Sequence, residues 1–230
     1  MNLEKYSKIQ NIAKEVMQNL AADICADSSE QSIAARAKEL LKTFGVTETW
    51  YHNAPAFVLL GNRSCLSISG RDYVPATELV GSSNLVTIDL SPCVDNIWGD
   101  YARSFVVENG AVISNPKTEA FKEGLKMVKH LHFEMQKYVS PETTFSELFA
   151  FGNHLIVEQG WENLDFLNNL GHSIEASIER RRFIDDGCKE QLGAVSYFTF
   201  EPHIRKKGEI WGFKHENIYY FDDSMKINEL

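Results

Sequence analysis

Two aspartates lie in strand-like sequence that otherwise reads as protein core. Asp89 is the only acidic residue in the apolar run Val86–Leu90, and Asp100 begins a second strand-like run eleven residues later. A carboxylate inside an apolar strand is costly unless it is paired or bound to a metal ion. Both aspartates are therefore candidate metal ligands or catalytic groups.

Two glutamates interrupt apolar sequence in the same way near the end of the chain. Glu201 ends the run from 197 to 201, and Glu216 interrupts the run from 213 to 220. Each acid alone also has a structural explanation, because strand acids are more often salt-bridged or exposed than catalytic. Arg103 is an available partner for Asp100, and Glu216 fits an exposed strand face.

Helices and strands must position these acids. The predicted helices and strands follow one another in the same order in two parts of the chain. Apolar residues at helical spacing predict helices at 3–20, 27–45, 116–138 and 144–160. Asp27 with Glu30 and Thr144 with Glu147 form capping-box patterns at the second and fourth helices. Alternating polarity predicts strands at 47–52, 57–60, 66–69, 85–91, 100–107, 196–201 and 209–221.

Each half, 1–110 and 111–230, thus reads as a helix, a capped helix and strands. Two similar halves that face each other form a cleft, and pockets favour such junctions. Because no low-complexity linker separates the halves, we expect a single domain over residues 1–230.

Taken together, the motifs resemble those of the pita-bread metallopeptidases of family M24, which include methionine aminopeptidase, aminopeptidase P and prolidase. Asp89 and Asp100 resemble the paired aspartates of the family, and His172 in the segment 170–174 resembles its Gly-His loop. The segments 200–202 and 212–217 resemble its Glu-Pro motif and its final Gly-x-Arg-x-Glu-Asp segment.

The resemblance covers about residues 10–222 and matches the catalytic unit, without the large N-terminal domain of aminopeptidase P and prolidase. It implies an α+β fold of the pita-bread (creatinase/aminopeptidase) type. In that fold a pseudo-symmetric, curved antiparallel sheet has its helices on the outside.

The resemblance also implies a role for each matching residue. Asp89 would chelate one metal ion, His172 and Glu201 would bind a second, and Asp100 and Glu216 would bridge the two. Glu201 would take a proton from the attacking water, which makes Glu201 and His172 the expected catalytic residues. A lone histidine is more often structural than a ligand, but the Gly-His motif favours the ligand role.

The chemistry of this ligand set agrees with two divalent ions. The four carboxylates carry a total of about four negative charges, and two divalent cations balance this charge. Oxygen-rich ligands without a thiolate favour Mn, Fe or Co over Zn. Two such ions lower the pKa of a bridging water and polarise a substrate carbonyl.

The sequence departs from the family where two further histidines orient the scissile carbonyl. The segment Ser69–Pro75 lacks the first of them, and Glu179 stands seven residues after His172, where the second is expected. Tyr73 and His203 are the candidate replacements in substrate binding. Because an ionised Glu179 attracts cations, we expect a small substrate with a positive group and poor activity on long peptides; the alternative is that Glu179 pairs with the arginines at 180–182.

These observations favour a dinuclear, metal-dependent hydrolase of the aminopeptidase or dipeptidase (Xaa-Pro peptidase) type, acting on a small peptide or amide. One alternative is a non-peptidase of the same fold, creatinase-like or lyase-like, acting on a small cationic metabolite. Another is an inactive binding module, which the five intact ligands disfavour.

Composition limits the partners and the cellular compartment that we expect for this protein. The net charge of −9 argues against nucleic acid as a partner. No run of eighteen apolar residues could span a membrane, and the first twenty residues lack a signal-peptide pattern. The four cysteines are widely spaced, as expected for reduced thiols in a cytoplasmic protein. The oligomeric state stays open, with a homodimer as one alternative.

Overall fold

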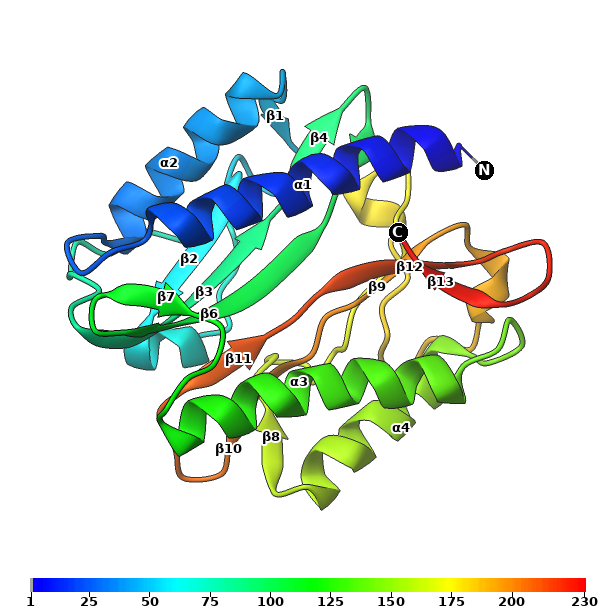
Figure 1. Cartoon of the computed structure of the whole chain (residues 1–230). Coiled ribbons are helices and arrows are strands. Elements are labelled where there is room, and N and C mark those ends of the chain that lie inside the picture. Colours follow the sequence, from blue (N-terminus) through cyan, green and yellow to red (C-terminus); the bar gives the residue numbers. More distant parts are fainter. Residues whose placement is uncertain (1) are drawn as a thin grey trace.

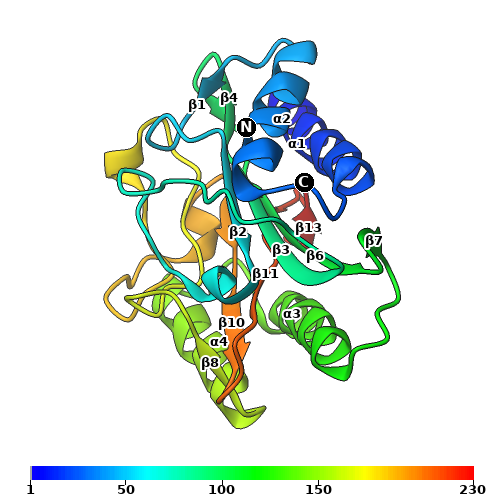
Figure 2. The same ribbon diagram turned by 90° about the vertical axis from the view of Figure 1, so that its left-hand side faces the viewer.

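The computed structural model describes residues 2–230 and shows helices packed on antiparallel sheets. Figure 1 places α1 and α2 on one side of the strands and α3 and α4 on the other, and Figure 2 shows the same layers from the side. The helices are α1 (Leu3–Asp23), α2 (Glu30–Thr43), α3 (Glu119–Tyr138) and α4 (Phe145–Glu158), with the short 3₁₀ helices η1 (Gly61–Cys65), η2 (Ile178–Arg180) and η3 (Leu192–Ala194).

The largest sheet has the strand order β2-β3-β6-β7, with all neighbours antiparallel. Three small sheets have the orders β1-β4-β5, β11-β10-β8 and β13-β12-β9. The strands are β1 (Glu48–Thr49), β2 (Ala56–Leu60), β3 (Ser83–Leu90), β4 (Pro92–Val94), β5 (Ile97–Trp98), β6 (Tyr101–Glu108), β7 (Ala111–Ile113), β8 (Trp161–Asn163), β9 (Phe198–Phe200), β10 (His203–Lys206), β11 (Gly212–Lys214), β12 (Asn217–Phe221) and β13 (Ile227–Glu229).

Local signals explain most helix ends, and one of them differs from the sequence-based expectation. Thr144 caps α4 in a capping box with Glu147, as predicted. At α2, however, the capping box is formed by Ser29 and Ser32 and not by Asp27 and Glu30. The prediction was wrong because Glu30 is buried there. Its carboxylate accepts hydrogen bonds from Leu60 N and Arg63 Nε instead of capping the helix.

The strand predictions need two corrections. Residues 66–69 form a loop and no strand, and the run 209–221 is divided into β11 and β12 by His215 and Glu216. The strands predicted at 85–91 and 100–107 are present as β3 and β6, which pair in the register Asp89↔Ala102. A smaller hairpin, β4–β5, lies between those strands.

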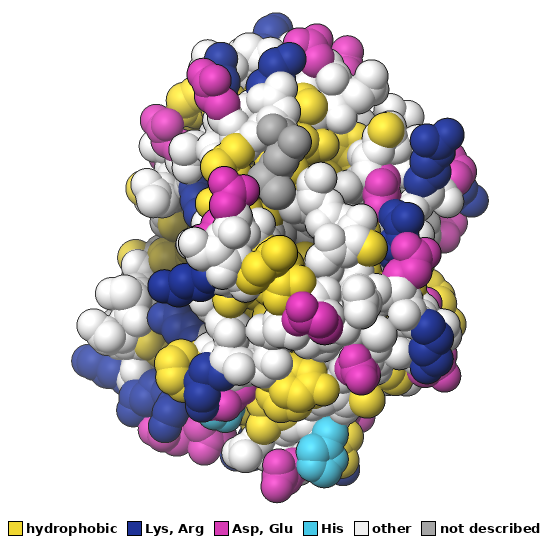
Figure 3. Space-filling model, turned by 90° about the vertical axis from the view of Figure 1, so that its right-hand side faces the viewer, with side chains coloured by type: hydrophobic (Ala, Val, Ile, Leu, Met, Phe, Trp, Pro, Cys, Tyr) yellow, Lys and Arg dark blue, Asp and Glu magenta, His cyan; other side chains and the backbone are white. Residues whose placement is uncertain are grey.

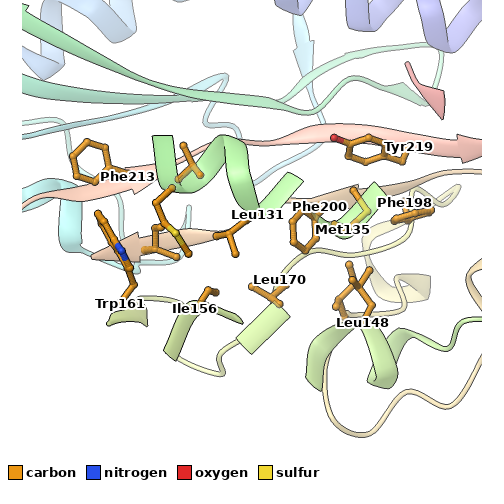
Figure 4. Close-up of a cluster of buried hydrophobic side chains, with 14 of the residues drawn as sticks. Leu131, Met135, Leu148, Ile156, Trp161, Leu170, Phe198, Phe200, Phe213 and Tyr219 are labelled. Atoms are coloured by element: carbon orange, nitrogen blue, oxygen red, sulfur yellow. The ribbon is translucent and has the colours of Figure 1, made fainter. Parts of the chain in front are cut away.

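The two larger of three hydrophobic clusters hold the layers together. One packs α1 and α2 on the strands of the first half, and includes Val16, Leu41 and Ile88. The other packs α3 and α4 on the strands of the second half, as Figure 4 shows. This second cluster also takes in Leu85 from β3 and Val106 from β6, so strands of the first half contribute to the core of the second.

The helix α3 lies very close to β11, the strand that carries Lys214. A Cβ atom on Gly124 would lie 2.2 Å from ring atoms of Phe213, so only glycine allows this approach. On the face shown in Figure 3, acidic and basic side chains lie interspersed with hydrophobic ones. Among residues 2–230, no helix is long and apolar enough to cross a membrane.

Candidate metal and substrate site

The β3–β6 hairpin carries the two aspartates at its end. Asp89 lies in β3, and Asp100 immediately precedes β6. The backbone of Asp100 is clamped by the fully buried Gln10 of α1, which accepts from Asp100 N at 3.0 Å and donates to Asp100 O at 2.7 Å. This pair of bonds fixes the direction in which the buried Asp100 carboxylate points.

His172 is positioned by a close approach of two backbones. The residue before it, Gly171, has a φ of +140°, and a Cβ atom there would lie 2.4 Å from Thr199 O. The imidazole Nδ1 donates to Ser173 O at 2.9 Å, because a carbonyl oxygen can only accept. In the neutral ring this leaves the lone pair on Nε2, which is the atom that faces the carboxylates.

Glu216 lies in the break between β11 and β12, with its side chain 1% exposed. Glu216 N donates to Ala102 O at 3.0 Å, and Arg103 donates to Glu216 O at 2.7 Å. Arg103 also donates to Asn217 Oδ1 at 2.6 Å. Arg103 therefore holds the backbone beside Glu216, and in this structure it makes no hydrogen bond to the Asp100 side chain, the alternative that the sequence left open.

The structure brings all five predicted ligands together. His172 Nε2 lies 3.5 Å from Asp100 Oδ2 and 3.8 Å from Glu201 Oε1. Asp89, Glu201 and Glu216 each present an oxygen atom, and these atoms lie within 4.8 Å of one another. Such a group of carboxylates could hold a metal ion.

Three carboxylate oxygens within this cluster support that assignment. Within residues 2–230, Asp100 Oδ2 and both side-chain oxygens of Glu216 are buried without a hydrogen-bond partner. Buried polar atoms normally have partners, because leaving them unpaired costs about 1–3 kcal/mol each. A divalent cation would satisfy them, so the residues fit a metal site.

Charges inside the cluster shift its pKa values in opposite directions. Burial, with Asp89 and Glu201 nearby, raises the pKa of Asp100 well above its usual range, and burial also raises that of Glu216. Burial opposes ionisation of Glu201 too, but Lys214 and His172 outweigh it and lower its pKa to about 2. Burial lowers the pKa of His172 to about 4, so the ring is neutral at pH 7.

Lys214 is the residue of the cluster that sequence reasoning missed. Its Nζ lies 2.5 Å from Asp89 Oδ2, 2.9 Å from Glu201 Oε2 and 3.6 Å from Glu216 Oε2. The available signal was its place in the segment 212–217, where it stands at the arginine of the family motif. A basic side chain two residues before Glu216 on an extended chain points to the same side of the sheet.

A pocket of roughly 380 Å³ opens over the cluster. Aromatic and apolar side chains line it together with Asp89, Asp100, His172, Glu201 and Lys214; they include Trp50, Tyr51, Phe57, Leu66, Phe166 and Phe183. Trp50 meets the His172 ring edge-on, with ring centroids 5.5 Å apart. The pocket thus joins the charged cluster to an apolar wall, the usual composition of a small-ligand site.

Arg181 is the second residue of the site that sequence reasoning missed, since the basic run 180–182 reads as a surface cluster. Its guanidinium carbon lies 5.3 Å from the Trp50 ring centroid and 5.0 Å from that of Phe183, and the side chain lines the pocket. Burial lowers its pKa, although Asp100 and Glu201 oppose this. Its Nε donates to Ile178 O, and no side-chain ion pair to it is found within the described residues 2–230.

Two of the proposed substrate-binding residues do not reach the pocket. Glu179 is exposed in η2 and is absent from the pocket lining. The Tyr73 hydroxyl is occupied by β2, since it accepts from Val58 N and donates to Val58 O. Glu179 therefore gives the expectation of a cationic substrate no support, because this acid lies on the surface outside the pocket.

His203 lines the pocket but presents the wrong hydrogen-bonding atom. Its Nε2 donates to Ser64 O at 2.6 Å, and burial lowers its pKa to about 4. The neutral ring therefore has a lone pair on Nδ1 and no second N–H. His203 cannot replace a histidine that donates to a substrate carbonyl while it keeps this bond.

Comparisons with known proteins agree with this geometry. The chain is similar to a prolidase from Thermococcus sibiricus (20% identity, TM-score 0.82, 99% of this chain and 57% of that one). It is also similar to an X-Pro aminopeptidase from Thermotoga maritima MSB8 (20% identity, TM-score 0.81, 99% and 60%). A methionine aminopeptidase from Rickettsia prowazekii matches with 12% identity and a TM-score of 0.76 over 99% of this chain and 95% of that one.

These likenesses establish the pita-bread fold predicted from the sequence, and the chain spans about 57–60% of the first two of these proteins. No curated protein sequence matches the chain significantly. The model of metallopeptidase family M24, however, matches residues 4–223, which is nearly the whole chain. Together with the cluster of carboxylates and His172 at the floor of its pocket, this match shows that the chain belongs to metallopeptidase family M24.

Proposed function

We propose that this chain is a metal-dependent hydrolase that cleaves small peptides, with two divalent ions held by Asp89, Asp100, His172, Glu201 and Glu216. The observation that carries the proposal is the convergence of these five side chains beneath one pocket, with three buried carboxylate oxygens left without a partner in residues 2–230. Ions at these ligands supply Lewis acidity toward a carbonyl oxygen and activate water for attack.

The residues of the chain have distinct tasks in this reaction. Glu201 is ionised at neutral pH because its pKa is low, so it can accept the proton of an attacking water. His172 holds its Nε2 lone pair toward the cluster through the bond from Nδ1 to Ser173 O. Trp50 and Phe183 exclude water from the wall of the pocket beside them.

Arg181 supports a substrate with a free carboxylate. Its guanidinium lies over two aromatic rings and lines the pocket beside the ligand cluster. A preoriented guanidinium binds a carboxylate through two parallel hydrogen bonds. A pocket of this size with a carboxylate anchor accommodates a dipeptide or a tripeptide, which favours a dipeptidase-like activity.

The proposal is tested with protein stripped of metal by a chelator and then supplied with Mn, Fe, Co or Zn. A panel of dipeptides, with and without proline in second position, is expected to be hydrolysed only after metal is restored. Asp100→Asn should lower the rate by more than about a hundredfold, because it removes a ligand charge. Asp186→Asn, which alters an exposed acid, is the matched control. Turnover that is unaffected by the chelator would refute the proposal.

A further inference from the structure

The Lys214 ammonium group lies within the ligand set itself. It makes its two shortest contacts with Asp89 Oδ2, at 2.5 Å, and Glu201 Oε2, at 2.9 Å, and the side chain is only 16% exposed. The backbone of Lys214 is anchored from both sides, because Ser104 Oγ accepts from Lys214 N at 2.9 Å and donates to Lys214 O at 3.2 Å. The base of the side chain is therefore fixed, and its four-carbon stem reaches the carboxylates.

The ligand set consequently has two unlike sides. On the Asp89 side, the ammonium group already hydrogen-bonds Asp89 Oδ2 and pairs with Glu201 Oε2, two oxygen atoms that an ion would use. On the other side, His172 Nε2 faces Asp100 Oδ2 and the second oxygen of Glu201, Oε1, and Asp100 Oδ2 has no hydrogen-bond partner in residues 2–230. An ammonium group and a divalent cation compete for the same lone pairs, and their like charges repel each other strongly at this range.

We propose that Lys214 controls how many metal ions the site holds. One divalent ion binds tightly on the His172 side, and a second binds on the Asp89 side only when the Lys214 ammonium group moves away. Lys214 also lines the pocket, so its side chain has open space beside the cluster into which it can turn. This inference rests on the metal-dependent function proposed above and adds a residue that regulates it.

The test is a titration of metal-free protein with Mn²⁺, followed by calorimetry and by electron paramagnetic resonance. Wild-type protein is expected to bind one ion tightly and a second at least about tenfold more weakly, with the spin-coupled signal of an ion pair appearing only at high Mn²⁺. Lys214→Met keeps the stem and removes the charge, so the second ion should bind at least about tenfold more tightly and the coupled signal should appear at two equivalents. Lys206→Met is the control, because Lys206 pairs with Glu123 at the surface.

Several results would overturn the inference. Two ions that bind wild-type protein with equal affinity would overturn it and leave the proposed function intact. A second-ion affinity unchanged in Lys214→Met would do the same. If that variant fails to fold, as judged by circular dichroism, Lys214→Gln, which also removes the charge, is titrated in its place with the same expected result. Absence of ion binding to both proteins would overturn the proposed function together with this inference.

Discussion

At the scale of single residues, the site depends on which atoms of each side chain already take part in a hydrogen bond. His172 and His203 both line the pocket, but His172 donates from Nδ1 and His203 donates from Nε2. The first arrangement frees Nε2 as a ligand atom, and the second leaves only an acceptor facing the site. The same reasoning excludes Tyr73 as a substrate-binding residue, because its hydroxyl already accepts from Val58 N and donates to Val58 O.

Arg181 gives a prediction about substrate recognition at this scale. Arg181→Met should raise KM for a dipeptide with a free carboxylate by about tenfold or more, because it removes a charge-assisted pair of hydrogen bonds, and should change kcat little. The same dipeptide as its C-terminal amide should be affected much less. Steady-state kinetics on both substrates check this. Arg180→Met, an exposed neighbour, is the control, and an equal loss on acid and amide would show that Arg181 does not bind the carboxylate.

At the scale of elements, helix α3 supports the site from behind through a buried histidine. His132 Nδ1 lies 2.8 Å from the Tyr219 hydroxyl of β12, and its Nε2 lies 2.9 Å from His215 O, next to Glu216. Because a carbonyl can only accept, Nε2 carries the proton in the neutral ring and Nδ1 accepts from Tyr219. This chain of bonds ties α3 to the break between β11 and β12.

The burial of His132 predicts how stability depends on pH. Burial lowers its pKa from 6.5 to about 3 in the folded protein. The unfolded chain therefore binds a proton that the folded protein does not, so stability is fully present above pH 6.5 and falls with decreasing pH down to about pH 3. The free energy of unfolding should lose up to about 1.4 kcal/mol per pH unit from this group within that window.

Urea unfolding of metal-free protein at pH 7, 6 and 5 measures this dependence. His132→Gln should be less stable than wild type at pH 7, since it disturbs two buried hydrogen bonds, but its stability should fall less steeply toward pH 5. His154→Gln, which alters an exposed histidine on α4, should leave the slope unchanged. An identical slope in wild type and His132→Gln would contradict the assignment.

At the scale of the whole molecule, the two halves share both the site and the core. Asp89 and Asp100 come from the first half, whereas His172, Glu201 and Glu216 come from the second. Direct bonds cross between the halves, from Thr87 Oγ1 to Gly212 O at 3.2 Å and from Lys14 Nζ to Glu229 Oε1 at 3.1 Å. We therefore keep the prediction of one domain over residues 1–230.

Limited proteolysis under native conditions tests that prediction. No stable fragment ending near Gly110 should accumulate, because separating the halves would expose Leu85 and Val106, which are buried in the cluster of the second half. Mass spectrometry of the digestion products identifies the cleavage sites. A persistent fragment of residues 1–110 that keeps its helical circular dichroism would show that the halves are independent domains.

The sequence by itself determined the features that depend on local patterns. The strands that carry Asp89 and Asp100 could be predicted because strand alternation is a short-range signal, and the two strands pair as β3 and β6. The cap of α4 at Thr144 was equally local. The order of the family motifs indicated the fold and the ligand candidates, since each motif needs only its neighbours along the chain.

Only the tertiary structure decided which side chains share the pocket. The segment after His172 has no periodicity, so its sequence could not show that Arg181 faces the site while Glu179, two residues earlier, faces solvent. Nor could local sequence show that the Lys214 ammonium group lies next to Asp89 and Glu201 as well as its neighbour Glu216. The contact between Asp89 and Lys214 joins residues more than a hundred positions apart and depends on how whole layers pack, which no local pattern encodes.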